Sequence, residues 1–115
     1  MFSKPHRIPS VLISTIMRTG KRTIAGCLQC TTANAKNSIA WRCAVVVPTS
    51  TDKRAVVRNR IKRLISESIT RLSPELPAGM DFVFFVKKGF EYASQKQAND
   101  QVHTLLQKIG YTQVL

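Results

Sequence analysis

The chain has 115 residues, enough for one small domain with its own core. Hydrophobic residues make up 43%, which excludes a fully disordered chain. Lysine and arginine number 18 against 6 acidic residues, and the net charge of +12 favours a nucleic acid over an anionic membrane as partner. No apolar run approaches the roughly 20 residues of a membrane span, and none predicts a signal peptide, so we expect a cytoplasmic protein.

The first part of the chain predicts an arm followed by a short helix. Residues 1–9 predict an extended, flexible and poorly packed basic arm, because their two prolines disfavour helix in the residues before them. A helix follows over about 10–18, where apolar residues repeat at i, i+4 spacing. Ser10 can cap its start and Gly20 can end it.

Two strands are expected next. Alternating apolar residues predict a strand over 24–30, and a polar turn region covers 31–38. The segment 39–47 ends in a continuous run of β-branched residues, which is typical of an interior strand covered on both faces. We expect these two strands to pair as an antiparallel hairpin.

The three cysteines are Cys27, Cys30 and Cys43, and the first two form a C-x-x-C motif that suggests zinc or redox chemistry. In a strand, however, residues three apart face opposite sides. The chain has no second such motif, and His6 and His103 are scattered, so a zinc ligand set is incomplete. We therefore expect small buried apolar residues and no metal site.

A basic amphipathic helix is predicted over about 53–71, with Thr51 or Asp52 as its cap. Its first part carries six basic residues and no acid: Lys53, Arg54, Arg58, Arg60, Lys62 and Arg63. At 100° per residue, one side collects Val57, Ile61, Leu64, Ile65, Ser68 and Leu72. The opposite side collects Asn59, Lys62, Arg63 and Ser66, with Arg58 and Arg60 on its flanks. The sequence thus predicts a buried stripe and a positively charged face.

An ordinary solvated helix face is the alternative interpretation of this charge. Such faces usually mix signs, because glutamate–lysine pairs at i, i+4 stabilise them. Here Glu67 stands alone near the end of the run. Concentrated like charge is self-repulsive, so the pattern favours a polyanionic partner.

The C-terminal part predicts a strand over 81–87 and a last helix. Ser94 and Gln97 form a capping box, an apolar stripe follows, and Gly110 ends the helix. The order helix, strands, helix, strand, helix predicts one α+β domain over 1–115, in which helices pack on a mixed, mainly antiparallel sheet. Its β-α-β crossover should be right-handed by the general rule.

Catalytic side chains are not predicted. The acidic residues are scattered and form no D-x-D, D-x-E or E-x-x-H set; His6 lies in the arm, and we expect His103 at the surface of a helix rather than as a base. We therefore expect a protein that binds rather than cleaves.

The segment 55–65, which reads A-V-V-R-N-R-I-K-R-L-I, resembles the signature of the bacterial ribonuclease P protein component, an Arg-Asn-Arg core followed by Lys-Arg on one helix. The resemblance implies an α/β sandwich whose crossover is left-handed, against the general rule. It also implies a protein subunit that assists Mg²⁺-dependent removal of the 5′ leader from precursor tRNA. The catalytic RNA would bind most of the Mg²⁺ and perform the chemistry, with one protein per RNA and no membrane or DNA partner.

The resemblance also assigns roles to the basic helix. In the family its residues contact the catalytic RNA near the active site and the junction with precursor tRNA. That role passes to Arg58, Asn59, Arg60, Lys62 and Arg63, with Lys53 and Arg54 as neighbours. The basic side chains can contact phosphates, and the asparagine can bond a 2′-hydroxyl or a base edge, or cap a backbone group.

A second expected site is the family's cleft between the first helix and the sheet, which holds the single-stranded leader. Aromatic residues of that helix commonly stack on bases there. This chain has Ile13 and Met17 at those positions, while Lys21, Arg22 and Arg42 could line a groove that follows phosphates. Because aliphatic residues stand where the family commonly has aromatic ones, the resemblance implies a divergent member of the family. We expect its three clustered phenylalanines in the core: Phe82, Phe84 and Phe85.

Two other functions are compatible with the charge. One is a different small basic RNA-binding protein, such as a ribosome-associated protein without a nuclease role. The other is a DNA-binding helix in a major groove, which the lack of a clear helix-turn-helix partner disfavours.

Overall fold

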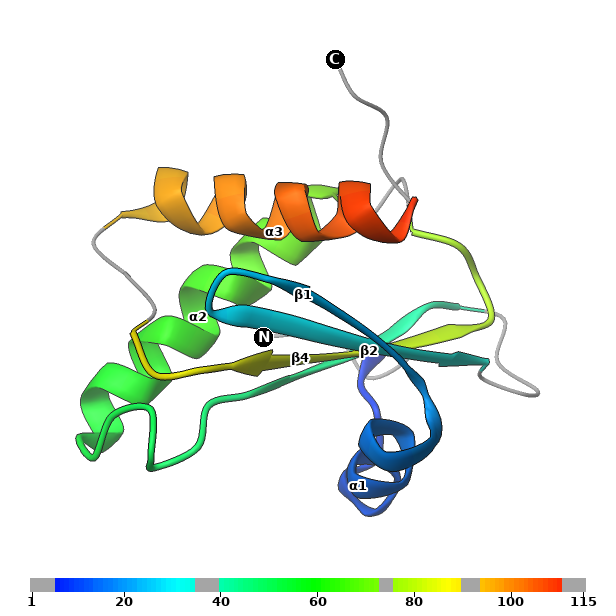
Figure 1. The fold of residues 1–115 in the computed structure, drawn as a ribbon, viewed down its shortest axis with the longest axis horizontal. Helices are drawn as coiled ribbons and strands as arrows, with labels where there is room; N and C mark the ends of the chain where they lie inside the picture. The colour runs from blue at the N-terminus through cyan, green and yellow to red at the C-terminus, as the bar shows by residue number, and fades with distance from the viewer. Residues whose placement is uncertain (1–5, 35–39, 73–75, 90–93, 111–115) are drawn as a thin grey trace.

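A computed structural model of the chain describes residues 6–34, 40–72, 76–89 and 94–110. Its elements are α1 (Ser10–Thr19), β1 (Lys21–Ala25), β2 (Leu28–Asn34), β3 (Arg42–Val46), α2 (Ala55–Leu72), β4 (Met80–Val86) and α3 (Gln95–Ile109). The strands form one sheet in the order β1-β2-β4-β3. Helix α1 lies on one face of the sheet and α3 on the other, while α2 runs obliquely at the side (Figure 1).

The sheet is mixed and mainly antiparallel, as predicted. Strands β1 and β2 are antiparallel, as are β2 and β4, whereas β3 and β4 are parallel. A parallel pair needs a crossover connection, and α2 supplies it between β3 and β4. The predicted β-α-β unit is therefore confirmed.

The prediction that segments 24–30 and 39–47 form an antiparallel hairpin was wrong. The segment 24–30 is not one strand but the end of β1, a turn at Gly26 and Cys27, and the start of β2. Gly26 has φ +61°, the left-handed conformation that two-residue hairpin turns require. The antiparallel hairpin thus forms between β1 and β2, and the segment expected to pair with 24–30 instead forms β3 beside β4.

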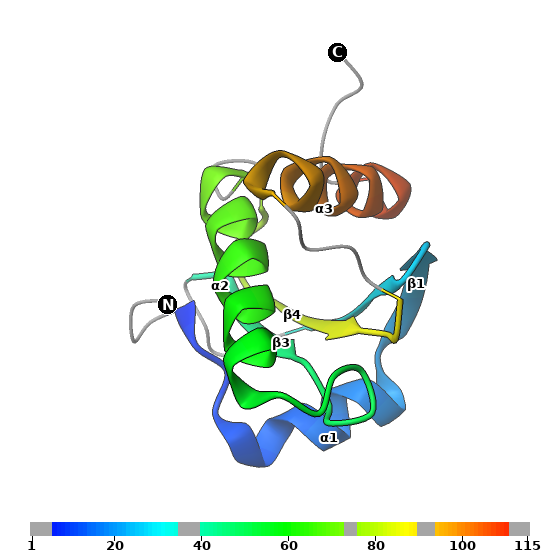
Figure 2. The same ribbon diagram turned by 90° about the vertical axis from the view of Figure 1, so that its left-hand side faces the viewer.

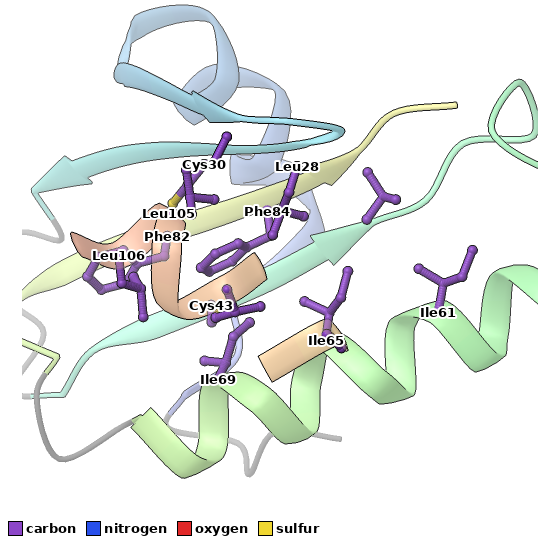
Figure 3. Close-up of a cluster of buried hydrophobic side chains, with 14 of the residues drawn as sticks. Leu28, Cys30, Cys43, Ile61, Ile65, Ile69, Phe82, Phe84, Leu105 and Leu106 are labelled. Atoms are coloured by element: carbon purple, nitrogen blue, oxygen red, sulfur yellow. The ribbon is translucent and has the colours of Figure 1, made fainter. Parts of the chain in front are cut away.

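The main core lies between the sheet and helices α2 and α3 (Figure 3). Alternate residues of the central strands point into it, because successive strand side chains face opposite sides. Its largest fully buried members are Leu28, Phe82, Phe84, Ile61, Ile65, Ile69, Leu105 and Leu106. The apolar stripes predicted for α2 and α3 are therefore the buried faces of both helices.

The cysteines are all free thiols. Cys30 and Cys43 are buried members of the main core, and burial raises the pKa of both thiols. Cys27 is half-buried in the β1–β2 turn rather than in a strand. Two of the three cysteines thus act as the small apolar core residues that we expected.

A smaller core lies under α1, on the other face of the sheet. Ile8, Ile16 and Val83 are its buried members. The N–H of Ile8 donates to the carbonyl of Cys43 at 3.3 Å, and the His6 ring stacks on Trp41 with centroids 4.0 Å apart. The predicted arm was therefore wrong for residues 6–9, because these residues are not poorly packed but lie beside β3. Residues 1–5 lie outside the described residues.

The helix ends follow the predictions in part. The Ser94 hydroxyl accepts the Gln97 N–H at 3.2 Å, and Gly110 ends α3 with φ +97°. Ser10 does not cap α1, because it is the first helical residue and Pro9 precedes it without a side-chain bond. Gly20 does end α1, with extended backbone; a β-carbon there would lie 2.6 Å from the Thr32 carbonyl. In the described part of the chain no helix could span a membrane.

Candidate nucleic-acid interface

Helix α2 carries five of the seven residues that were predicted to bind the catalytic RNA. Its first turns lie toward the α1 side of the sheet and its last turns beside α3 (Figure 2). Ile61, Ile65 and Ile69 anchor it, each at most 1% exposed. The outward face is therefore held by a packed core before any partner binds.

The outward face of α2 carries unpaired positive charge. Asn59, Arg60 and Arg63 are exposed, and Lys62 is half-buried. Across the described ranges, the ion pairs within 4.0 Å are Arg42–Asp81 and Arg54–Asp52, so no carboxylate neutralises these three cations. Their charges remain available to an anionic ligand.

Arg58 has a second role in the protein itself. Its Nη1 donates to the backbone carbonyls of Asp52, at 3.0 Å, and Lys53, at 2.8 Å. These bonds fix the loop that leads into α2, because they join the first turn of the helix to the residues before its start. Arg58 is half-buried, so it can still contact a ligand, but removing it also disturbs the loop.

The start of α2 is organised by Asp52. Its carboxylate accepts the Arg54 N–H at 2.9 Å and two guanidinium bonds from Arg54 at 3.1 and 3.0 Å. These bonds lower the pKa of Asp52 to about 2. The Arg54 side chain stays 70% exposed and Lys53 is exposed, so both predicted neighbours of the basic face reach solvent.

Ser66 corrects the predicted surface of α2. The helical wheel placed it on the exposed side, whereas it is 5% exposed. The helix contacts two partners: Gln95 of α3 bonds the Leu64 carbonyl at 2.9 Å on one side, while β3 packs on another. Two partners cover a wider sector of a helix than the single stripe that the wheel assumed, so the exposed face is narrower and excludes Ser66.

The α1 side of the sheet holds the other predicted residues. Ile13 and Met17 are half-buried and pack on the small core. Lys21 and Arg22 are both exposed, but strand register pairs them with Thr32 and Thr31, so they leave opposite faces of β1. Only Arg22 lies on the face that α1 covers.

Arg42 is not an unpaired cation. Its Nε and Nη2 donate to the two carboxylate oxygens of Asp81, each at 2.7 Å. Asp81 is 3% exposed, and its hydrogen bonds raise the pKa of Arg42. The Arg42 guanidinium, which we expected to contact leader phosphates, is thus paired with a carboxylate of the neighbouring strand β4. A role for Arg42 in leader binding stays a prediction.

Phe85 was expected in the core with Phe82 and Phe84, and for Phe85 this prediction was wrong. Phe82 and Phe84 are fully buried in the main core, but Phe85 is half-buried on the α1 face, where the register places it between Gln29 and Val46. The alternation of β4 already separates it from the other two phenylalanines. It gives this face an accessible aromatic ring, which α1 itself lacks.

Candidate metal ligands are scattered over the part of the chain that the structure describes. Across the described residues, no three histidine, cysteine, aspartate or glutamate side chains could together hold a metal ion. The described surface therefore offers cationic and aromatic contacts, which suit a nucleic acid, rather than a carboxylate centre.

Comparisons with known proteins point to one family. A curated ribonuclease P protein component of Bacillus cereus (strain AH187) is 59% identical over 34 residues, 30% of this chain and 30% of that protein. Its counterpart from Brevibacillus brevis is 49% identical over 37 residues, 32% of this chain and 29% of that protein. The matched segments thus span less than a third of the curated relatives' length.

Solved structures share the fold over nearly the whole chain. The RNase P protein of Staphylococcus aureus superposes with a TM-score of 0.83 at 17% identity, covering 96% of this chain and 100% of that one. The RNase P protein from Thermotoga maritima gives 0.77 at 21% identity, covering 90% and 96%. The family model of Ribonuclease P matches residues 3–110. Sequence family and fold agree, and the chain belongs to the Ribonuclease P family.

Proposed function

We propose that this chain is the protein subunit of a ribonuclease P ribonucleoprotein, with an RNA as its permanent partner. One observation carries the proposal: Arg60, Lys62 and Arg63 project unpaired charge from a helix whose other side is locked into the core. Each phosphate that such a face neutralises releases counterions, so binding is favourable and falls steeply with salt. The family and the fold support the same proposed function.

The substrate in this proposal is precursor tRNA, and its single-stranded 5′ leader lies on the α1 face of the sheet. Phe85 supplies a ring on which a base can stack, and Arg22 supplies a cation on the same face. Ile13 and Met17 form an apolar wall instead of an aromatic one. Stacking therefore comes from the sheet rather than from the helix.

The RNA subunit performs the chemistry in this proposal. Mg²⁺ supplies charge stabilisation for phosphodiester hydrolysis when bound, and the RNA holds most of it, since the described residues offer no ligand cluster. The protein binds and orients. Positive charge on α2 lowers the repulsion between the catalytic RNA and its substrate, which reduces the Mg²⁺ concentration needed. One protein per RNA and a cytoplasmic location belong to the same proposal.

Reconstitution tests the proposal. The protein is added to a bacterial ribonuclease P RNA at low Mg²⁺, and cleavage of precursor tRNA is followed. We expect strong stimulation by the wild type, loss of stimulation by Arg60→Gln with Arg63→Gln, and full stimulation by Lys96→Gln. Lys96 is the matched control because it is an exposed cation on α3. No stimulation by the wild type would refute the proposal.

A different RNA-binding protein, such as a ribosome-associated one, is the competing function. It would use the same basic face but would have no reason to prefer a leader. Equal affinity for precursor and mature tRNA would favour it, whereas tighter binding of the precursor supports the subunit role.

A further inference from the structure

The exposed face of α2 carries an apolar side chain among its cations. Val56 is 80% exposed, although the next branched residues of the helix turn inward. Arg60 and Arg63 follow it by four and seven residues, so all three lie along one side of the helix. A solvated basic face gains nothing from a valine at this place, which suggests that something apolar covers it.

A hollow lies over this valine. It has a volume of about 390 Å³ and is lined by Val56, Arg60, Arg63 and Leu64. We call it the Val56 hollow. Two aliphatic side chains form its apolar part, and two guanidinium groups without a carboxylate partner among the described residues stand beside them. Glu67 is the nearest acid along this side of the helix, and it lines the adjoining hollow with Arg63.

We propose that the Val56 hollow receives one unpaired nucleobase of the partner RNA. This inference rests on the proposed function and adds base recognition to the same helix. A nucleobase has two apolar faces and is tethered to a phosphate, so it matches an apolar floor flanked by guanidinium groups. Arginine planes stack on bases as well as bind phosphates. An isolated phosphate would use the arginines and leave Val56 uncovered.

Only a base that is neither stacked nor paired within a helix can fill the Val56 hollow. Within an RNA helix the bases are stacked and paired, so only a bulged, looped or terminal base can enter the hollow. Binding by α2 then has two components with different salt dependence. Phosphate contacts weaken as salt rises, because counterions are released on binding, whereas apolar contact with Val56 is insensitive to salt.

The test uses two RNA probes: a short hairpin carrying one bulged adenosine, and the same hairpin without the bulge. Binding of the full chain is followed by fluorescence anisotropy at several salt concentrations. We expect the wild type to prefer the bulged hairpin. Val56→Ser should bind it about fivefold to tenfold more weakly, with an unchanged salt slope and unchanged affinity for the unbulged hairpin.

Val11→Ser is the matched control, because Val11 is 79% exposed on α1 and lies outside the hollow. It should leave both affinities unchanged. Thermal unfolding of both variants checks that the fold survives, as expected for exposed valines. The inference is overturned if the wild type binds both hairpins equally, or if Val56→Ser affects both probes alike. A wild type that binds neither hairpin would instead count against the proposed function itself.

Discussion

Arg42 and Asp81 meet across the parallel strands β3 and β4 in a bidentate pair, with both nitrogen–oxygen distances at 2.7 Å. The register places the two residues directly opposite each other. Because Asp81 is 3% exposed, its charge is tolerated only while the guanidinium satisfies both oxygens. The pair therefore joins the first residue of β3 to the start of β4 and holds these two parallel strands together.

Asp81→Asn should destabilise the domain by about 2–3 kcal/mol. The amide cannot accept both guanidinium bonds, and Arg42 would remain partly buried without a counter-charge. Urea unfolding measures the change. Asp100→Asn is the control, because Asp100 is an exposed acid on α3 and should change stability by less than about 0.5 kcal/mol. Equal stability of Asp81→Asn and the wild type would show that the pair adds nothing.

Arg58 and Arg60 should separate folding from binding. Arg60→Gln should leave the melting temperature unchanged and lower the slope of log affinity for RNA against log salt by about one, as for one lost phosphate contact. Arg58→Gln should lower both RNA affinity and stability, the latter by about 1 kcal/mol, because two bonds to the loop before α2 are lost. Paired thermal and binding titrations make the comparison. Identical behaviour of the two variants would contradict the second role of Arg58.

The pKa of Asp52 predicts how the start of α2 responds to acid. Its ordinary value is 3.8, and bonds from Arg54 lower it to about 2 in the folded protein. A depressed folded-state pKa adds stability above the unfolded-state value, and that stability is lost as pH falls from about 4 to about 2. NMR titration of the Asp52 carboxyl should show the low value in the wild type and a higher pKa in Arg54→Gln, which loses the guanidinium bonds but keeps the backbone N–H bond. A normal pKa in the wild type would show that the Asp52–Arg54 pair does not form in solution.

Strong periodicity made some elements predictable from the sequence. The stripes of α2 and α3, the β4 strand and the Ser94 cap of α3 depend on neighbours within a few residues. The β1–β2 turn was missed because apolar residues alternate straight through Gly26, so composition alone showed no break. The partner of β3 was missed as well, because pairing between distant segments leaves no local pattern, whereas the crossover was predicted because it follows from element order.

The candidate site divides in the same way. The basic residues of α2 were predictable because one helix carries them all. The partner of Arg42 was not, because it depends on the register between β3 and β4, which lie on either side of the crossover helix. Ser66 was misplaced because a helical wheel does not show how many partners a helix has. The placement of Phe85 on the α1 face could have been inferred from strand parity alone.

Phe85 leads to the last prediction. Phe85→Ala should weaken binding of precursor tRNA by about 1–3 kcal/mol, as for one lost stacked base, and leave mature tRNA binding unchanged. Phe84→Ala is the contrasting variant: its ring is fully buried in the main core, so it should cost about 3–5 kcal/mol of stability. Filter binding with both tRNAs and urea unfolding separate the two effects. If Phe85→Ala weakened both tRNAs equally, or destabilised the fold as much as Phe84→Ala, the ring would be structural, and the leader would have to contact another part of the sheet.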